Sequence, residues 1–442
     1  MSRGLRCFML ALAVACIGSS TAISIDEHGA IAGESGIEAA SANSLAIEKA
    51  FAATQSSEDD RVVEIPAGGT YYVYSSTLAN LTDVTFKIDG DLYVHDVLED
   101  WPDTNGLYVF GFTDMTGLTI TGNGKINGQG HDWWVAVART DIAHNYRPNM
   151  FEMLRVTDCV IENFTTMDSP HFNFHMKDML NLEIRYMTIT TDWRKQEAIL
   201  KEFGLFDFDL NIPMFPFNTD GFDPAGENIW IHDCEIENYD DAVAVKPSSS
   251  KYNTPCTKNV LVENIKVKYG VGMSIGSVSA NSHHDCVDNV TFRNIEFEKP
   301  FKAIYIKTNP GGDEGVDSGS ISNIVYENIT IESPVWYAIY IGPQQMKEPD
   351  GAGTGCMAYP FGGGDENCPT NPLVPIVNVT LKDVSISGGV TPGVVRCNET
   401  APCTGFDFDN VQYTSWASRL EGWICENVEG NEHKVQPKNC LA

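Results

Sequence analysis

A short motif recurs about every thirty residues along most of this chain, and no other feature constrains the fold as strongly. Each copy opens with an asparagine, continues as a short stretch of alternating apolar and polar residues, and passes through a polar turn into a second short stretch. Alternation with a period of two predicts strands with one buried face. Many such strands, joined by Asn, Asp and Gly turns, predict a parallel β-helix in which each coil covers the apolar face of its neighbour. Clear copies begin at Asn80, Asn228, Asn259, Asn289, Asn323 and Asn378.

A β-helix needs a cover at each end of its core. The segment from Asn43 to Phe51 combines apolar residues at helical spacing with a plausible N-cap at Asn43, so we expect an N-terminal helical cap within about residues 23–60. The cysteine-rich end, about residues 397–442, is expected to cover the last coil. The sequence thus predicts an all-β, single-domain parallel β-helix over residues 23–442.

Residues 1–22 have the pattern of an export signal, with Arg3 and Arg6 ahead of an apolar run and small residues before the expected cleavage site. We therefore expect a secreted protein, extracellular or associated with a cell wall. The apolar run is too short to span a bilayer comfortably, and no later stretch reaches about 18 uninterrupted apolar residues. A membrane protein is not expected.

Sixty acidic residues stand against 29 basic ones, which gives a formal net charge of −31. Such a surface repels nucleic acid and anionic membranes, so neither is an expected partner. A polyanionic polysaccharide would also be repelled at long range. Binding it requires a local basic cleft, acid pH or screening by salt.

Ten of the twelve cysteines follow the expected signal and would lie in an oxidising compartment, where disulfides persist. Cys159 and Cys234 occupy similar Asp-Cys-x-Ile-Glu-Asn segments, so we expect buried free thiols on neighbouring coils. No CxxC or HExxH spacing indicates a metal site. Six sequons permit glycosylation, with Asn398 as the strongest candidate. Proximity in the sequence suggests the disulfides Cys256–Cys286, Cys356–Cys368, Cys397–Cys403 and Cys425–Cys440.

Two insertions interrupt the repeat, at residues 196–216 and 342–372, and both are rich in aromatic residues or glycine. Loops of this length in a solenoid favour the walls of a binding cleft over simple linkers.

Two acidic segments occupy the same place in consecutive repeats: Asn218-Thr-Asp-Gly and Tyr239-Asp-Asp-Ala. Stacking the repeats would bring Asp220, Asp240 and Asp241 to one spot. Crowded carboxylates cannot all ionise easily, so one retains a proton at mildly acidic pH. A carboxylic acid beside a carboxylate is the chemistry of glycoside hydrolysis. The alternative is that Asp-Gly and Asp-Asp are ordinary turn and surface pairs in a very acidic chain.

Four segments resemble, in order and approximate spacing, the signature segments of glycoside hydrolase family 28, the polygalacturonases. This resemblance implies a right-handed parallel β-helix that hydrolyses pectin backbones with inversion of configuration and without a metal or other cofactor. The segments are Asn218-Thr-Asp-Gly221, Tyr239-Asp-Asp241, Gly270-Val-Gly-Met-Ser-Ile-Gly-Ser277 and Ile306-Lys307, supported by residues 122–134, Ser169-Pro170 and Cys397–Cys403.

The resemblance also implies roles for individual residues. Asp240 would be the general acid, while Asp220 and Asp241 would hold and activate the water. Asn218 would orient these groups, and Lys307 would meet a carboxylate of the substrate.

Two positions depart from the family pattern. The usual Gly-His-Gly is Gly270-Val271-Gly272, and the usual arginine of Arg-x-Lys is Tyr305. These changes bear on substrate and rate more than on fold. Tyr305 is placed in the cleft by its motif and could stack on a sugar face.

Two further residues are candidates for binding substrate. His175 would line the cleft, or serve only as a hydrogen-bonded wall residue. Lys246 follows the Asp-Asp strand and would contact a uronate, or is simply a solvated lysine.

The sequence therefore predicts a secreted, monomeric glycosidase of the polygalacturonase type that cleaves α-1,4-galacturonosyl linkages of pectin. Alternatives are a hydrolase of rhamnogalacturonan or xylogalacturonan, a calcium-dependent polysaccharide lyase, and a non-catalytic polysaccharide-binding protein. A lyase would give unsaturated products and lose activity with a chelator. Binding without release of reducing sugar would indicate the non-catalytic protein.

Overall fold

The computed structural model describes residues 22–56, 61–143, 145–192, 194, 206–207, 212–213, 216, 218–249, 254–344, 369–414, 422–438 and 440–441. Residues 1–21 of the expected export signal lie outside this set, as do most of both insertions and the expected Cys356–Cys368 pair. In the part that is described, no helix is both long and apolar enough to cross a bilayer.

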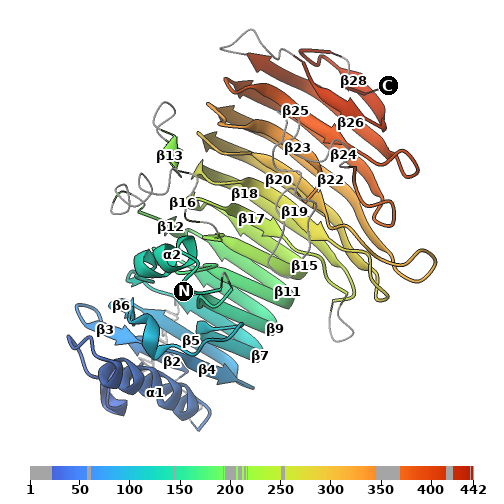
Figure 1. The fold of residues 1–442 in the computed structure, drawn as a ribbon. Coiled ribbons are helices and arrows are strands. Elements are labelled where there is room, and N and C mark those ends of the chain that lie inside the picture. Colours follow the sequence, from blue (N-terminus) through green and yellow to red (C-terminus); the bar gives the residue numbers. More distant parts are fainter. Residues whose placement is uncertain are drawn as a thin grey trace, which may run out of the picture.

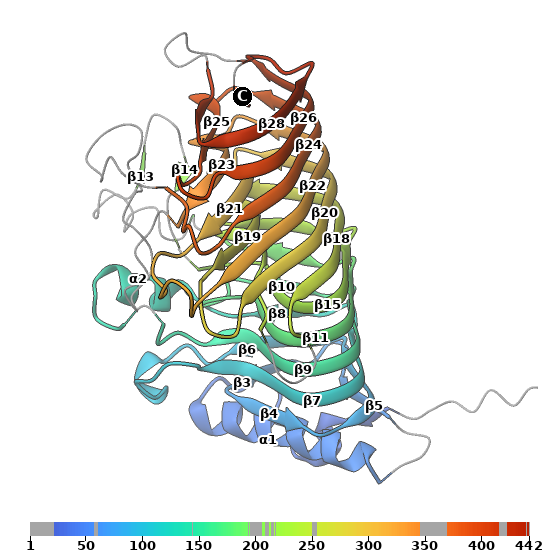
Figure 2. The ribbon, with the colours of Figure 1, turned by 90° about the vertical axis from the view of Figure 1, so that its right-hand side faces the viewer.

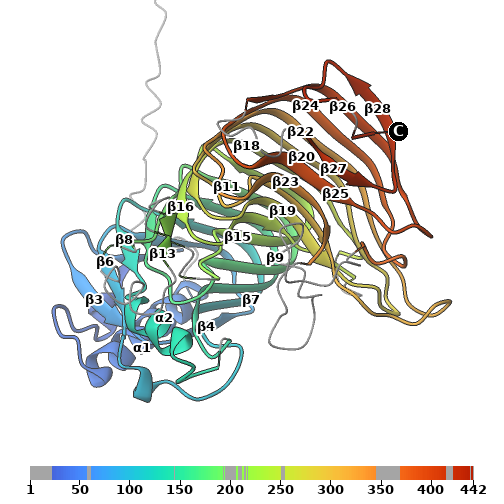
Figure 3. The same cartoon turned by 45° about the horizontal axis from the view of Figure 1, so that its top comes forward.

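The strands form a right-handed parallel β-helix, as predicted, in which 26 strands make one continuous sheet. Figure 1 shows the coils stacked from the blue N-terminal end to the red C-terminal end. Parallel pairing places each strand above its counterpart in the preceding coil. Figure 3 shows the long strands lying side by side along the stack.

Three series of strands make up the coils. The long series begins with β1 (Ile23–Ser24), β2 (Val62–Ile65), β4 (Ser76–Ala79) and β5 (Thr82–Ile88). It continues through β7 (Tyr108–Thr121), β9 (Asn149–Glu162), β11 (Phe174–Arg185), β15 (Phe222–His232), β18 (Thr257–Tyr269), β20 (Asp285–Glu298), β22 (Gly319–Glu332), β24 (Ile376–Ser387), β26 (Cys403–Thr414) and β28 (Val428–His433).

The second series carries the sequence-predicted acidic pair at its start. It consists of β17 (Asp241–Val245), β19 (Gly272–Val278), β21 (Ile304–Thr308), β23 (Tyr337–Pro343), β25 (Thr391–Arg396) and β27 (Ile424–Glu426). The third series consists of β3 (Thr70–Val73), β6 (Asp91–Val94), β8 (Lys125–Asn127), β10 (Thr165–Met167), β12 (Thr188–Thr190) and β16 (Glu235–Asn238). Outside the main sheet, β13 (Phe206–Asp207) pairs antiparallel with β14 (Ile212–Pro213).

The asparagine that opens each repeat forms a corner between coils. Asn259 has a φ of 57°, a left-handed conformation that asparagine adopts more easily than other residues with a side chain. Its Nδ2 donates to Oδ1 of Asn228 at 3.1 Å, and Nδ2 of Asn289 donates to Oδ1 of Asn259 at 2.8 Å. The repeat was therefore visible in the sequence because this left-handed conformation and a side-chain hydrogen bond to the neighbouring coil recur along the stack.

Apolar side chains fill the interior in register. Phe110, Phe151, Phe174 and Phe222 are paired through successive strands, with ring centres 5.3, 4.5 and 5.2 Å apart. Val243 follows them in the next coil. This row fixes the register of the residues that point outward on either side of it.

The N-terminal cover of the core is the helix α1 (Ile37–Thr54), which packs Phe51 against Phe86 and Phe112. Figure 2 shows it lying across the first coil. The helix begins seven residues earlier than predicted, with Gly36 as its N-cap in place of Asn43. The buried Asn43 side chain instead forms hydrogen bonds with the backbone of Ile31 and Tyr72, and these bonds tie the helix to neighbouring segments. The remaining helices are η1 (Ile25–His28), η2 (Leu98–Asp100) and α2 (His131–Ala138).

Three of the expected disulfides are present: Cys256–Cys286, Cys397–Cys403 and Cys425–Cys440. Cys159 and Cys234 are buried free thiols, as predicted, but they do not occupy matching places on neighbouring coils. Asp158, before Cys159, bonds Asn181 at one corner, whereas Asp233, before Cys234, bonds Asn264 at another. The two similar segments belong to different corners because the repeat contains two strand-and-turn units. Glycosylation of the sequons stays a prediction.

Candidate active site

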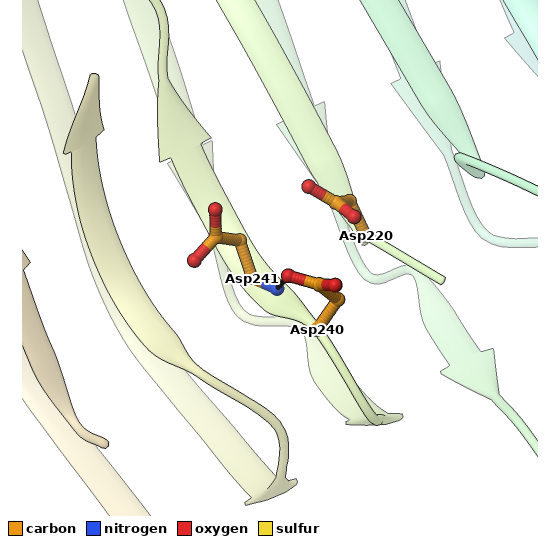
Figure 4. A group of neighbouring side chains, drawn as sticks. All are labelled: Asp220, Asp240 and Asp241. Atoms are coloured by element: carbon orange, nitrogen blue, oxygen red, sulfur yellow. Dashed lines mark hydrogen bonds between the residues drawn. The ribbon is translucent and has the colours of Figure 1, made fainter. Parts of the chain in front are cut away.

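Three carboxylates meet where the second series of strands begins. Asp220 precedes β15, while Asp240 and Asp241 open β17 in the next coil. The backbone N–H of Gly221 donates to the carbonyl of Asp241 at 2.9 Å, which sets the two coils in register. One oxygen from each carboxylate lies within 4.8 Å of the others. Figure 4 shows the three side chains grouped together, as the stacking of repeats predicted.

Backbone amides hold Asp240 in place. Its Oδ2 accepts from the N–H of Asn218 at 2.8 Å, and its Oδ1 accepts from the N–H of Asp241 at 2.9 Å. Asn218 reaches this position through a φ of 59°. The side chains of Asp220 and Asp241 are almost completely buried, whereas Asp240 keeps intermediate exposure. Asp240 is therefore the carboxyl group of the three that is most open to a ligand.

Burial disfavours the charged form of two of these carboxyls. It raises the pKa of Asp240 to about 6, and the neighbouring charge of Asp241 adds to the rise. Burial also raises the pKa of Asp220 well above its usual range, together with the charges of Asp223 and Asp240. Both groups are thus disposed to keep a proton in mildly acidic solution.

Asp241 behaves in the opposite way. Burial works against its charge, but the ammonium groups of Lys307 and Lys246 and the hydrogen bonds from Lys307 and Ser274 together outweigh burial, and the pKa of Asp241 falls below its ordinary value. Nζ of Lys307 donates to Oδ2 of Asp241 at 2.8 Å, and Oγ of Ser274 donates to Oδ1. The site therefore combines a protonated carboxyl with an ionised one a short distance away, which suits general acid–base chemistry.

Lys307 lies where the sequence predicted, but its charge is already paired. Only 6% of the residue is exposed, and its ammonium bonds Asp241. The predicted contact with a substrate carboxylate stays a prediction. Tyr305 points outward from the same strand, because Ile304 and Ile306 alternate with it in the core, and it is 4% exposed.

The structure also brings His175 and Lys246 to this face. Outward-facing residues of neighbouring coils pair as Glu152, His175 and Asp223. Nδ1 of His175 lies 2.7 Å from Oε2 of Glu152, and Nζ of Lys246 lies 3.2 Å from Oδ2 of Asp223. Lys246 helps to lower the pKa of Asp241. Both residues are hydrogen-bonded or ion-paired, and their roles toward a substrate stay predictions.

Sequence reasoning missed Asp223, which is fully buried and raises the pKa of Asp220. Its position, three residues after Asp220 in the same motif, was an available signal. It also missed Arg147, which is 2% exposed and donates to Oδ1 of Asn218 at 2.9 Å and to the carbonyl of Pro170 at 3.1 Å. No motif surrounds Arg147, so only the folded chain reveals it.

The two departures from the family pattern meet in one apolar patch. We define the aromatic patch as Tyr305, Tyr337, Tyr340 and Val394, and half-buried Val271 packs against it. Tyr305 pairs with Tyr340 in the next coil, and Tyr340 pairs with Val394. The patch therefore extends from the carboxylates toward the C-terminal coils.

A hollow of about 540 Å³ lies on another face among the described residues. It is lined by acidic and basic side chains such as Glu235, Lys266 and Glu296, and by no member of the carboxylate group. Its charges are arranged in pairs along neighbouring coils, so it lacks the crowded carboxylates that the chemistry requires.

Residues 56–437 match the family model described as glycosyl hydrolases family 28. The chain belongs to this family. It is therefore a glycoside hydrolase by descent, and the family resemblance seen in the sequence is confirmed.

Relatives within family 28 have different named activities. A probable polygalacturonase of Arabidopsis thaliana is 28% identical over 426 residues, which cover 93% of this chain and 78% of the relative. Rhamnogalacturonase A of Aspergillus aculeatus is 25% identical and covers 87% of this chain and 72% of its own length. The solved structure of the endo-xylogalacturonan hydrolase from Aspergillus tubingensis has the same fold, with a TM-score of 0.68, 19% identity and coverage of 96% and 98%.

Proposed function

We propose that this family 28 member hydrolyses α-1,4-galacturonosyl linkages of pectin. The observation that carries the proposal is the group of three carboxylates with opposed pKa shifts. Asp240, whose pKa is raised to about 6, is the general acid. Asp241 is the ionised partner.

The proposed reaction uses one water molecule. Asp240 gives its proton to the glycosidic oxygen as the bond from that oxygen to the anomeric carbon breaks. Asp220 helps to hold the water molecule. Asp241 takes a proton from this water as the water oxygen bonds to the anomeric carbon. The products are two saturated sugar ends, and a proton shift between the carboxyls restores the starting state.

We propose that the reaction inverts the anomeric configuration. Carboxyl groups this close together would by the usual separation rule favour retention. Inversion is instead what the family 28 resemblance implies, and in that reaction Asp241 activates water and does not attack the anomeric carbon. NMR of the first-formed product decides the matter, since a product that keeps the starting configuration contradicts this proposal.

A second candidate is hydrolysis of rhamnogalacturonan, and the aromatic patch favours it. Val271 and Tyr305 present apolar surface close to the carboxylates. A deoxy sugar such as rhamnose offers a methyl group and an apolar face to such a surface. Rhamnogalacturonases are among the relatives of the chain.

A panel of polygalacturonate, rhamnogalacturonan and xylogalacturonan, assayed for new reducing ends, separates these substrates. We expect polygalacturonate to give the highest rate and Asp240→Asn to lower kcat by about 10²- to 10⁴-fold. Activity that survives in the variant excludes the acid role. Unsaturated products that are no longer formed when a chelator is added would instead indicate a lyase. Binding of the polymer without cleavage would indicate a non-catalytic protein.

We also propose that the protein is secreted and acts as a monomer on a polysaccharide. Recovery of the chain from culture medium with its first 22 residues removed tests secretion. Light scattering of the purified protein tests the oligomeric state.

A further inference from the structure

The cations around the carboxylates are nearly all committed to partners inside the protein. Lys307 bonds Asp241, Lys246 pairs with Asp223, and Arg147 donates to Asn218. A substrate that carries carboxylates therefore finds these charges already engaged, although a uronate needs a cation for specific recognition.

Lys302 is the exception among the described residues. It is 5% exposed, and no carboxylate or other acceptor of the described chain forms a hydrogen bond or ion pair with its ammonium. Its Nζ lies instead over aromatic rings, 4.3 Å from the ring centre of Tyr305, 5.3 Å from that of Phe301 and 5.8 Å from that of Tyr340. Cation–π contacts partly offset the loss of water around the ammonium.

The stacking of coils places Lys302 near the reaction site. The N–H of Val271 donates to the carbonyl of Asp240 at 2.8 Å, and the N–H of Phe301 donates to the carbonyl of Gly270 at 2.7 Å. Lys302, next to Phe301, is thus two coils from Asp240, with Val271 between them. The ammonium groups of Lys302 and Lys307 both approach the ring of Tyr305, at 4.3 and 4.6 Å.

Burial without an acceptor leaves the positive charge of Lys302 poorly compensated. Burial and the charge of Lys307 lower the pKa of Lys302 to about 7. An arriving carboxylate would supply the missing acceptor and counter-charge, while the buried rings of Tyr305 and Tyr340 keep the ammonium in place. The side chain of Val271, in the coil between those of Asp240 and Lys302, has no polar atom that could compete for the ammonium.

We propose that Lys302 binds the carboxylate of a uronate unit of the substrate, with the buried rings of Tyr305 and Tyr340 holding its ammonium in position. The inference deepens the proposed function and rests on it, because it names the residue that recognises the acidic sugar. It reassigns to Lys302 a role that the sequence pattern gave to Lys307. It also gives the aromatic patch a task that is compatible with an acidic substrate.

Binding to the catalytically disabled Asp240→Asn protein tests this inference without need for turnover. Trigalacturonate and its methyl ester are titrated at pH 6 into this parent and into versions that also carry Lys302→Met, Lys302→Arg or the control Lys266→Met, an exposed lysine on another face. We expect Lys302→Met to weaken binding of the free acid by at least about tenfold and to leave the ester unaffected, since only the acid has the charge. Lys302→Arg should retain binding within a few fold.

Two further readouts separate ligand binding from a structural role. In the parent, affinity for the acid should fall between pH 6 and pH 8 as the ammonium loses its proton, and this dependence should disappear in Lys302→Met. In the otherwise unaltered enzyme, Lys302→Met should raise KM for polygalacturonate while kcat stays within about threefold. If Lys302→Met does not fold, as judged by its thermal transition, Lys302→Gln replaces it.

Equal affinity of the parent and a folded Lys302 variant for the free acid overturns the inference, as does an equal loss for acid and ester. Failure of the parent to bind the acid overturns it too. If the parent binds the acid through Lys302 but the unaltered enzyme cleaves none of the three polymers, the proposed function fails and the binding inference stands.

Discussion

At the scale of single residues, the chemistry depends on opposite treatment of two adjacent aspartates. Among the described residues, the carboxylate of Asp240 accepts from two backbone N–H groups, whereas that of Asp241 accepts from an ammonium and a hydroxyl. Both are held in a poorly solvated environment, and the charges of Lys307 and Lys246 with the hydrogen bonds to Asp241 separate their pKa values. Lys307 therefore acts on the reaction from inside the protein by keeping Asp241 ionised.

The pH dependence of kcat follows from these shifts. Asp240 must be protonated to act as the acid, so kcat should fall as the pH rises through about 6. Asp241 must be ionised, and its lowered pKa places the acid limb below the range of an ordinary aspartate. A pH profile of kcat measures both limbs. Constant kcat from pH 5 to pH 8 would contradict the assignment of Asp240.

Arg147 is a positioning residue in this scheme, because it fixes the amide of Asn218, whose backbone holds Asp240. We expect Arg147→Met to lower kcat by about 10- to 100-fold through misplacement of the acid. The substitution also removes a positive charge that favours the ionised forms of Asp240 and Asp220. The pKa of Asp240 should therefore rise, and the alkaline limb of the kcat profile should move to higher pH. Arg147→Lys keeps the charge but not the guanidinium donors to Asn218 and Pro170. It should therefore restore the pH of the alkaline limb more fully than the value of kcat. An unshifted limb would indicate a purely structural role.

At the scale of strands and corners, a row of asparagines holds the coils in register and so aligns the carboxylates. We call this row, which includes Asn228, Asn259 and Asn289, the asparagine ladder. Each ladder residue combines a left-handed backbone with a side-chain amide that bonds the coil beside it. The same feature explains why several sequons coincide with the repeat, since Asn289, Asn328 and Asn378 all use Nδ2 in the ladder.

Replacing a ladder residue should separate its two contributions. Asn259→Ala should destabilise the protein by about 2–3 kcal/mol, of which about 1–2 kcal/mol is the cost of a left-handed backbone with a Cβ atom. Asn259→Gly accepts that backbone and should lose only the ladder hydrogen bonds. Thermal unfolding of both variants measures the difference. Equal destabilisation by Ala and Gly would show that the backbone conformation contributes little.

At the scale of the whole molecule, a strongly acidic protein is proposed to act on an acidic polymer. The net charge of −31 repels polygalacturonate until the polymer is close to the few cations on the catalytic face. Salt shortens the range of this repulsion from about 30 Å at 0.01 M to about 8 Å at 0.15 M.

The value of kcat/KM for polygalacturonate should therefore rise several-fold when salt is raised from 0.01 to 0.15 M. Fully methyl-esterified pectin fragments, which carry no charge, should show little change if they are cleaved at all. Initial rates at low substrate concentration measure this effect. A decrease with salt for the acidic polymer would mean that local attraction outweighs the overall repulsion.

The sequence by itself determined the β-helix, three disulfides and the meeting of Asp220, Asp240 and Asp241. The β-helix and the carboxylate group are encoded by repetition, because each coil carries the same local pattern and pairs with its immediate neighbour, whereas the disulfides follow from the proximity of their cysteines in the sequence. The start of α1 was misplaced, since Asn43 has the composition of a cap but serves a long-range contact.

Only the tertiary structure decided which partner each charged group takes. Lys307 lies 66 residues from Asp241 in the sequence, and Arg147 lies 71 residues from Asn218. Such contacts depend on how far each outward side chain reaches across coils, which a repeat pattern does not specify. The tertiary structure also left Lys302 without an acceptor among the described residues. The sequence carried the coil-to-coil register, whereas the balance of charge on the catalytic face arose from burial and long-range packing.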